Sequence, residues 1–179
     1  MFFVSEIKTT APERFRTPLQ EKVYRALDDL HIPFERVDTD EAITMEDCVQ
    51  IDAKLQMKMV KTLFLCNRQQ TAYYLFITPG DKPFSSRNFS SSLEISRVSF
   101  APSEKMQTML GTKIGAATVF SALLDTGGRV QIVFDRDVLT EQWYGCSDGT
   151  TTGYMKVSTD DILRKFLPFA HHRALTAEV

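Results

Sequence analysis

The sequence predicts one α+β (mixed α/β) domain, with a mixed, mostly antiparallel sheet surrounded by helices. Its 179 residues suffice for a single sizeable core and are too few for two ordinary domains. Apolar residues make up 43% of the chain and charged residues 25%, which is the balance of a globular protein. Segments with helical and strand-like spacing occur in mixed order along the chain, which favours this fold class.

The first segment, residues 1–16, shows no clear period, and we expect an irregular N-terminal arm. A helix should follow, because Thr17 can cap it, Pro18 suits its first turn and Gln20 can complete a capping box. Apolar residues then recur at helical spacing until His31, where the helix should end.

Strand signals dominate the next part of the chain. Residues 33–37 are typical of a short strand, and Thr44 can cap a second helix that runs to about residue 55. The β-rich runs at 59–65 and 72–78 are joined by the polar residues 67–70. This arrangement predicts an antiparallel hairpin.

Shorter elements are expected in the middle of the chain. Residues 85–92 favour a short helix, and residues 97–100 favour a strand. Ser103 can cap a further helix, with Gly111 at its C-terminal stop. The apolar run at 118–124 does not distinguish a helix from a strand.

The last part carries the clearest strand, at 130–134, which we expect near the centre of the sheet. A short helix at 138–143 and a strand at 154–157 should follow. Ser158 can open a final helix that ends near Pro168. After this helix, we expect a loose tail from His171 to Arg173. The domain would then span residues 17–173, followed by tail residues 174–179.

Charge limits the class of partner. The net charge is -2 and the pI about 5.9, so any basic patch must be local. Contact with one end of an RNA fits this limit better than coating a duplex, and DNA is not expected. The cations that could form the patch, or be only scattered surface charges, are Lys54, Lys58, Lys82, Arg87, Lys105 and Lys113.

The cysteines and the N-terminus indicate a cytoplasmic protein. Three cysteines give an odd number without a paired framework, which favours a reducing compartment. The N-terminus lacks the pattern of a signal peptide, and no stretch approaches the ~18 apolar residues of a membrane span. Apart from the adjacent His171 and His172, no pair has metal-ligand spacing, so we expect no metal and no cofactor.

Lys61 is the most unusual side chain of the predicted hairpin. On a strand it shares a face with Leu63 and Leu65, and a lysine on an apolar face must be paired or reach a cleft. It could instead belong to an edge strand and extend to water. The pattern alone leaves both interpretations open.

Cys146 offers a different chemistry. It lies in a polar, glycine-containing stretch and could be the nucleophile of a cysteine hydrolase. The available histidines are a helix-end residue, His31, and the pair in the tail, so a Cys–His pair requires the tail to fold back. From spacing alone, Gly115 is best explained as a turn glycine, and Thr118 and Thr150 as residues that hydrogen-bond nearby backbone.

Several stretches, taken in order, resemble one family. They are Met59-Val60-Lys61-Thr62-Leu63-Phe64-Leu65, Tyr73-Tyr74-Leu75, Leu110-Gly111 with Gly115, Leu123-Leu124-Asp125 leading to Val130-Gln131-Ile132-Val133-Phe134-Asp135, and Asp160-Asp161-Ile162-Leu163. Together they resemble the YbaK/prolyl-tRNA-synthetase-associated family of aminoacyl-tRNA editing domains, in its free-standing prolyl-tRNA-editing branch. The resemblance covers residues 17–173 and implies a YbaK-like fold with a cleft.

The resemblance implies a trans-acting deacylase that hydrolyses mischarged aminoacyl-tRNA, with Ala-tRNA(Pro) as the expected substrate. Its partners would be the acceptor end of the tRNA and an aminoacyl-tRNA synthetase. Lys61 would be the key side chain, and the loop 115–119 would correspond to the family's Gly-x-x-x-Pro loop, with Gly115 holding the ester. The residues implied to bind substrate are Ala116, Thr118, Val119, Cys146, Asp148 and Thr150.

Two departures from the family pattern suggest an alternative. Val119 stands where the loop has proline, and residues 146–151 stand where the family often has a His-Pro-x-x-Asn-Thr-like stretch. A catalytically silent tRNA-binding module of the same fold is therefore the second hypothesis.

Overall fold

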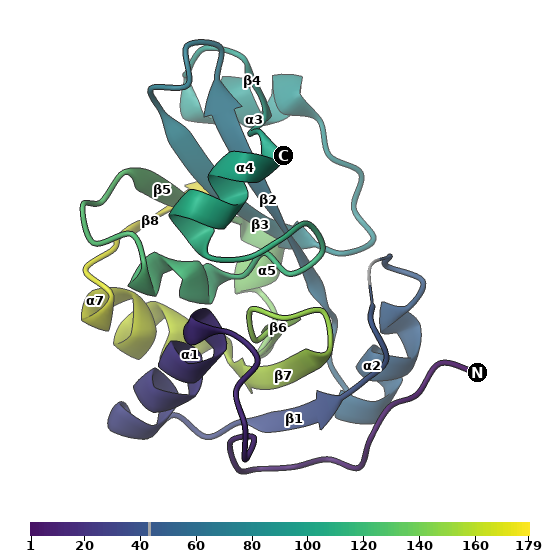
Figure 1. Ribbon diagram of the computed structural model, residues 1–179. Coiled ribbons are helices and arrows are strands. Elements are labelled where there is room, and N and C mark those ends of the chain that lie inside the picture. The colour runs from purple at the N-terminus through teal and green to yellow at the C-terminus, as the bar shows by residue number, and fades with distance from the viewer. Residues whose placement is uncertain (43) are drawn as a thin grey trace.

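The computed structural model describes residues 1–42 and 44–179, which form a single α+β domain with two sheets (Figure 1). The larger sheet has the order β4-β2-β3-β5-β8, and the smaller has the order β1-β7-β6. The strands are β1 (Glu35–Asp38), β2 (Val60–Asn67), β3 (Tyr73–Pro79), β4 (Val98–Phe100), β5 (Val130–Asp135), β6 (Trp143–Ser147), β7 (Gly153–Ser158) and β8 (Ala174–Ala177). The predicted fold class is confirmed, since four of the six strand pairings are antiparallel.

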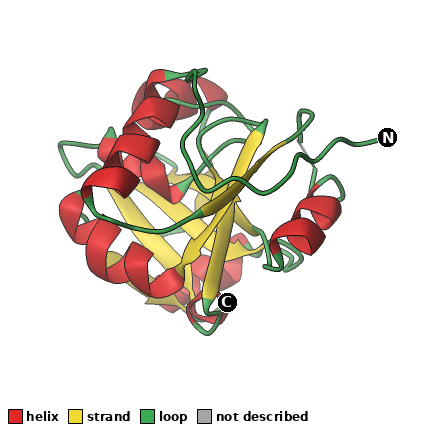
Figure 2. Cartoon of the chain, turned by 90° about the horizontal axis from the view of Figure 1, so that it is seen from below, coloured by secondary structure: helices red, strands yellow, loops and turns green. Residues whose placement is uncertain are grey.

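The helices are mostly short. The α-helices are α1 (Pro18–Asp29), α2 (Cys48–Leu55), α3 (Ser86–Leu93), α4 (Ser103–Lys105), α5 (Arg136–Leu139), α6 (Thr159–Asp161) and α7 (Leu167–Phe169). Three other helical segments are η1 (Met106–Leu110) and η3 (Ile162–Phe166), both π-helical, and η2 (Val119–Leu123), a 3₁₀ helix. Figure 2 shows α2 standing apart from the group of helices on the other side of the strands.

The predicted hairpin is confirmed, with β2 antiparallel to β3 over seven residue pairs, from Val60 opposite Pro79 to Cys66 opposite Tyr73. β5 pairs in parallel with β3 and β8, so it lies inside the sheet, as expected, with β3 in the middle position. One face of this sheet packs with α1, the C-terminal helical segments and the smaller sheet around Phe64, Ile132 and Phe166. The other face carries a second cluster that includes Phe76 and Phe89.

Side-chain caps fix several helix starts as predicted. The Thr17 hydroxyl accepts a hydrogen bond from the Gln20 amide at the start of α1, and Ser158 does the same for Asp161 in α6. Gly111 takes a left-handed conformation, with φ 68°, at the end of η1. The second predicted helix begins later than expected, at Cys48, because Thr44 and Asp47 exchange hydrogen bonds in a preceding turn.

Two expectations near the C-terminus are wrong. In place of the helix expected at 138–143, the structure has α5, which begins and ends earlier. It begins at Arg136 because the Asp135 side chain caps it there, and the expected end, Trp143, is the first residue of β6. The tail that begins at His171, expected to be loose, leads into β8. The His172 ring anchors this segment, because its Nε2 lies 2.8 Å from Asp125 Oδ2 and its Nδ1 lies 2.6 Å from the Ala170 carbonyl oxygen.

The N-terminal arm is docked along β1. Isolated bridges join Val4 to Thr39 and Lys8 to Arg36. The buried Arg36 guanidinium donates to the Thr10 carbonyl oxygen at 2.6 Å, which holds the arm in place. Within the described parts of the chain, no helix is both long and apolar enough to cross a membrane.

Candidate functional site

A pocket of about 370 Å³ lies between β2 of the larger sheet and strands β6 and β7 of the smaller one. Its walls come from β2, the end of β4, β6, the loop before η2 and the segment that leads into α2. The lining residues are Ala42, Thr44, Met45, Cys48, Met59, Val60, Lys61, Thr62, Leu63, Phe64, Phe100, Ala101, Ser103, Met106, Ile114, Gly115, Ala117, Cys146, Ser147 and Tyr154.

The pocket exists because neighbouring strands leave part of β2 uncovered. β4 pairs with β2 only from Leu65 to Asn67. Beyond the other end of this stretch, Met59 forms an isolated parallel bridge with Gly145 of β6. The residues between these two contacts border the pocket instead of another strand.

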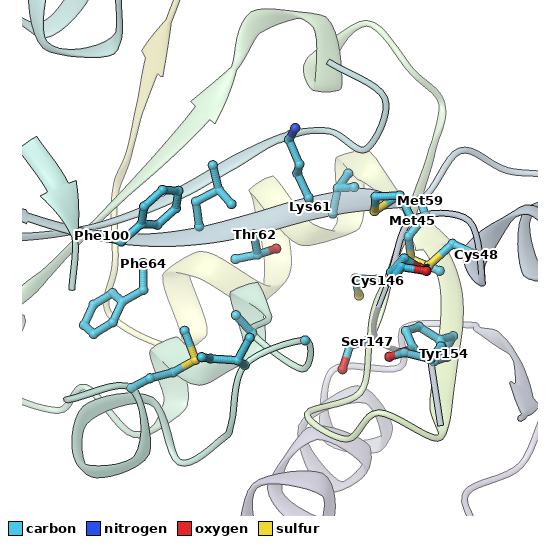
Figure 3. A pocket seen from close by; sticks show the side chains of 18 of the residues that line it. Met45, Cys48, Met59, Lys61, Thr62, Phe64, Phe100, Cys146, Ser147 and Tyr154 are labelled. Carbon is cyan, nitrogen blue, oxygen red and sulfur yellow. Dashed lines mark hydrogen bonds between the residues drawn. The ribbon is translucent and has the colours of Figure 1, made fainter. Parts of the chain in front are cut away.

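Lys61 lines the pocket, but its amino group points away from the pocket interior. Figure 3 shows the Lys61 nitrogen on one side of β2, with Thr62 and Phe64 on the other side, toward Ser147. This follows from strand alternation, which puts Lys61 on the same face as Leu63. In this position the ammonium group donates a hydrogen bond to the Lys82 carbonyl oxygen.

The loop before η2 forms the opposite wall. Gly115 has φ 91°, a conformation that favours glycine, and the Ala116 amide donates to the Lys113 carbonyl oxygen. Ala116 is therefore buried and already paired, whereas Gly115 and Ala117 line the pocket. The Thr118 hydroxyl donates to the Ser147 carbonyl oxygen at 2.8 Å, which ties this loop to β6.

Three other residues implied by the resemblance are not among the lining residues. Val119 is fully buried in the main core. Asp148 is 1% exposed and accepts hydrogen bonds from Gln20, Tyr24 and both the amide and hydroxyl of Thr150. Burial raises the pKa of the Asp148 carboxyl group. In this structure Asp148 and Thr150 tie the β6–β7 turn to α1.

The pocket interior is mostly neutral. Burial raises the pKa of the Cys48 thiol to about 11, and it also raises the pKa values of Cys146 and Tyr154. Among the described lining residues, Lys61 is the only one that carries a charge at neutral pH. A buried, protonated Cys146 thiol is a poor nucleophile, which argues against a cysteine hydrolase at this site.

Acidic partners neutralise most of the cations considered for an RNA-binding patch. Lys54 pairs with Glu6, Lys58 with Glu141, Lys82 with Asp135 and Asp137, and Lys113 with Glu41. In the part of the chain that the structure describes, Arg87 and Lys105 have no ion-pair partner. Lys105 directly precedes Met106, a lining residue.

Sequence reasoning missed most of the pocket wall. Thr62 and Phe64 could have been found, because strand alternation places both on the face opposite Lys61. Met45, Ser147 and Tyr154 gave no such signal, since they reach the pocket from segments far apart in the sequence.

Comparison with known families matches residues 39–165 to the aminoacyl-tRNA editing domain. The chain belongs to this family. The matched residues include the whole of β2 and the loop containing Gly115. The family assignment therefore agrees with the resemblance inferred from the sequence.

Individual relatives of this editing-domain chain support the assignment. The prolyl-tRNA editing protein ProX of Acetoanaerobium sticklandii is 24% identical over 143 residues, covering 80% of this chain and 87% of ProX. A crystal structure of a putative trans-editing enzyme for prolyl tRNA synthetase matches with a TM-score of 0.68 at 15% identity, covering 92% of this chain and 99% of that one. The crystal structure of a hypothetical protein also matches, with a TM-score of 0.68 at 15% identity. This match covers 87% of this chain and 98% of that one. The two structures show the same fold.

Proposed function

We propose that this protein is a trans-acting aminoacyl-tRNA deacylase that hydrolyses the ester of a mischarged tRNA. The observation that carries the proposal is a single pocket that brings Lys61 of β2 and the Gly115 loop together in a member of the editing family. An aminoacyl ester is already activated, so a positioned water and hydrogen-bond donors suffice for its hydrolysis. The neutral pocket provides a setting for this chemistry.

The proposed roles follow the positions of the groups. Lys61 stands at the pocket wall, and rotation of its flexible side chain would bring the ammonium group toward a phosphate of the tRNA 3′ end. Gly115 allows close approach of the substrate to the loop backbone. Ala116, Thr118, Asp148 and Thr150 would act indirectly by holding the loop and the β6–β7 turn in place.

The first substrate to test is Ala-tRNA(Pro). ProX is named a prolyl-tRNA editing protein, and one structural relative is described as a "putative trans-editing enzyme for prolyl tRNA synthetase". Synthetase pockets reject smaller or isosteric amino acids poorly by binding alone, which creates the need for a second, hydrolytic site.

The decisive experiment is deacylation of a panel of aminoacylated tRNAs by the wild type, Lys61→Ala and Lys22→Ala. Lys22 is exposed on α1, so Lys22→Ala is a matched loss of one positive charge away from the pocket. We expect turnover of at least one species by the wild type and Lys22→Ala, and its loss in Lys61→Ala. Turnover undiminished in Lys61→Ala would refute the role of Lys61.

A second candidate function is a tRNA-binding module without catalysis. Val119 replaces the loop proline, and the Lys61 ammonium group is bound to the Lys82 carbonyl oxygen. For this candidate, the same panel would show no turnover while the wild type still binds the tRNA acceptor end.

A further inference from the structure

The part of β2 that borders the pocket has an open hydrogen-bonding edge. Two backbone hydrogen bonds establish which residues face which neighbour. The Asn67 amide donates to the Ala72 carbonyl oxygen, so Asn67 faces β3. The Phe64 carbonyl oxygen accepts from the Ala101 amide, so Phe64 faces β4.

Alternation then gives the direction of Thr62. In an extended strand the N–H and C=O of one residue point to the same side, and residues two apart share that side. Thr62 therefore points its N–H and C=O the same way as Phe64, away from β3. No hydrogen-bond partner for either group is found among residues 1–42 and 44–179.

Neighbouring segments close this open edge at both ends. On one side the Phe64 carbonyl is occupied by Ala101, and on the other the Met59–Gly145 bridge brings β6 against β2. An added peptide strand would collide with both neighbours, so β-augmentation by a protein partner does not fit. What fits is a ligand with the hydrogen-bonding groups of a single amino-acid residue.

An aminoacyl ester is such a ligand, because it carries one α-amino group and one carbonyl oxygen. We propose that Thr62 binds the aminoacyl group as a one-residue antiparallel β pair, an inference that rests on the proposed deacylase function. The α-ammonium group donates to the Thr62 carbonyl oxygen, and the ester carbonyl oxygen accepts from the Thr62 amide. This is the two-bond ring of a hydrogen-bonded antiparallel pair.

The pairing also places the amino-acid side chain. Residues directly opposite each other in a sheet project their side chains to the same face. The substrate side chain therefore lies beside that of Thr62, which Figure 3 shows on the same side of β2 as Phe64 and Ser147. The side chain of the mischarged amino acid thus enters the neutral part of the pocket.

The Thr62 amide then takes part in the reaction. Water adds to the ester carbonyl carbon, and the carbonyl π electrons move to the oxygen that accepts from Thr62. When this tetrahedral species collapses, the bond to the ribose oxygen breaks, and that oxygen receives the proton lost by the water. The products are the free amino acid and the tRNA 3′ end. A backbone donor aimed at a developing oxyanion stabilises this transition state.

Proline substitution tests the backbone donor directly. Thr62→Pro removes the N–H that faces the pocket and leaves the hydrogen bonds to β3, which Lys61 and Leu63 make. The comparison variant Thr62→Val also loses the hydroxyl group but keeps the N–H. We expect kcat to be about 100-fold lower or more in Thr62→Pro than in Thr62→Val, the usual effect of losing one oxyanion donor. Equal kcat values in two folded variants would overturn the proposal.

Hydrogen exchange of the wild type provides a test that does not depend on the folding of a variant. The probe is a non-hydrolysable analogue, an amino acid joined by an amide bond to the 3′-amino group of 3′-amino-3′-deoxyadenosine. We expect the Thr62 amide to exchange fast without the analogue and to become protected with it, while Lys61 and Leu63 are protected in both states. An unchanged Thr62 amide at saturating analogue would also overturn the proposal.

The two proposals fail in different ways. A wild type that neither hydrolyses the tRNA panel nor binds the analogue would refute the deacylase function, and the Thr62 pairing with it. A wild type that deacylates, together with equal kcat values for Thr62→Pro and Thr62→Val, would refute only the Thr62 pairing.

Discussion

The Asp52 carboxyl group lies in surroundings that disfavour its charged form. It lies on α2, and its Oδ1 accepts a hydrogen bond from the Met59 amide at 3.1 Å, just before β2 begins. Burial raises the pKa of Asp52 to about 6, and the nearby Asp81 carboxylate contributes in the same direction. The hydrogen bond from Met59 only partly offsets these effects.

This perturbed carboxyl group predicts a pH-dependent stability. The folded protein holds the Asp52 proton up to about pH 6, whereas the unfolded chain loses it near pH 4, so the stability contributed by Asp52 falls as pH rises through that window. We expect Asp52→Asn to be more stable than the wild type at pH 7 and equally stable below about pH 4. Thermal unfolding from pH 4 to 8 measures this difference, and a constant difference across the range would contradict the assignment.

At the scale of single residues, local chemistry predicted the caps but only part of the pocket. Thr17 and Ser158 cap their helices as their residue type and spacing indicate. Lys61 and Gly115 were predicted as site residues from a family resemblance, and both line the pocket. Val119 shows the limit of that approach, because Gly115 and Ala117 of the same loop line the pocket while the Val119 side chain is buried in the core.

At the scale of elements, β8 depends on contacts outside the strand itself. Both ring nitrogens of His172 lie within hydrogen-bond distance of an oxygen, one from Asp125 and one from Ala170. Asp125 also accepts from the amides of Arg129 and Val130 at the start of β5. One side-chain pair thus joins the turn before β5 to the segment that leads into β8.

Removing this connection should loosen β8 more than the rest of the sheet. We expect His172→Ala to lower the free energy of unfolding by about 2 kcal/mol, through two lost hydrogen bonds, one of them to a buried carboxylate. The amides of β8 should lose protection in hydrogen exchange, while those of β2 and β3 keep it. Equal loss of protection throughout the sheet would show instead that β8 and the other strands unfold together.

Elements were predictable where the signal was local. The hairpin of β2 and β3 shows its own pattern of apolar residues and a polar turn, so it was predicted correctly. β6 was missed because Gly145, Ser147 and Gly149 suggest a turn, and only pairing with β7 makes the first part a strand. β8 was missed because it is a short strand after two histidines, stabilised by the distant β5.

At the scale of the whole molecule, charge limits how RNA can bind. The net charge is -2, and four of the six candidate cations are engaged with carboxylates. Few of these candidate cations are therefore free to release counterions from a tRNA backbone. Recognition should depend mainly on the acceptor end that enters the pocket.

Salt dependence of tRNA binding tests this conclusion. We expect a plot of log K against log salt concentration to have a slope shallower than about −3, because only a few phosphates are neutralised. Binding measured at several KCl concentrations gives the slope. A much steeper slope would show that the protein contacts an extended stretch of the tRNA backbone.

The position of β8 in the sheet has a consequence for biosynthesis. A ribosome makes β2, β3 and β5 well before β8, so the outer edge of β5 has no partner during that interval. That edge carries Ile132, Val133 and Phe134, an apolar run with strong strand preference. An unpaired edge of this kind invites association between nascent chains, so chaperones that hold emerging polypeptides should matter most for this protein just before its last strand is translated.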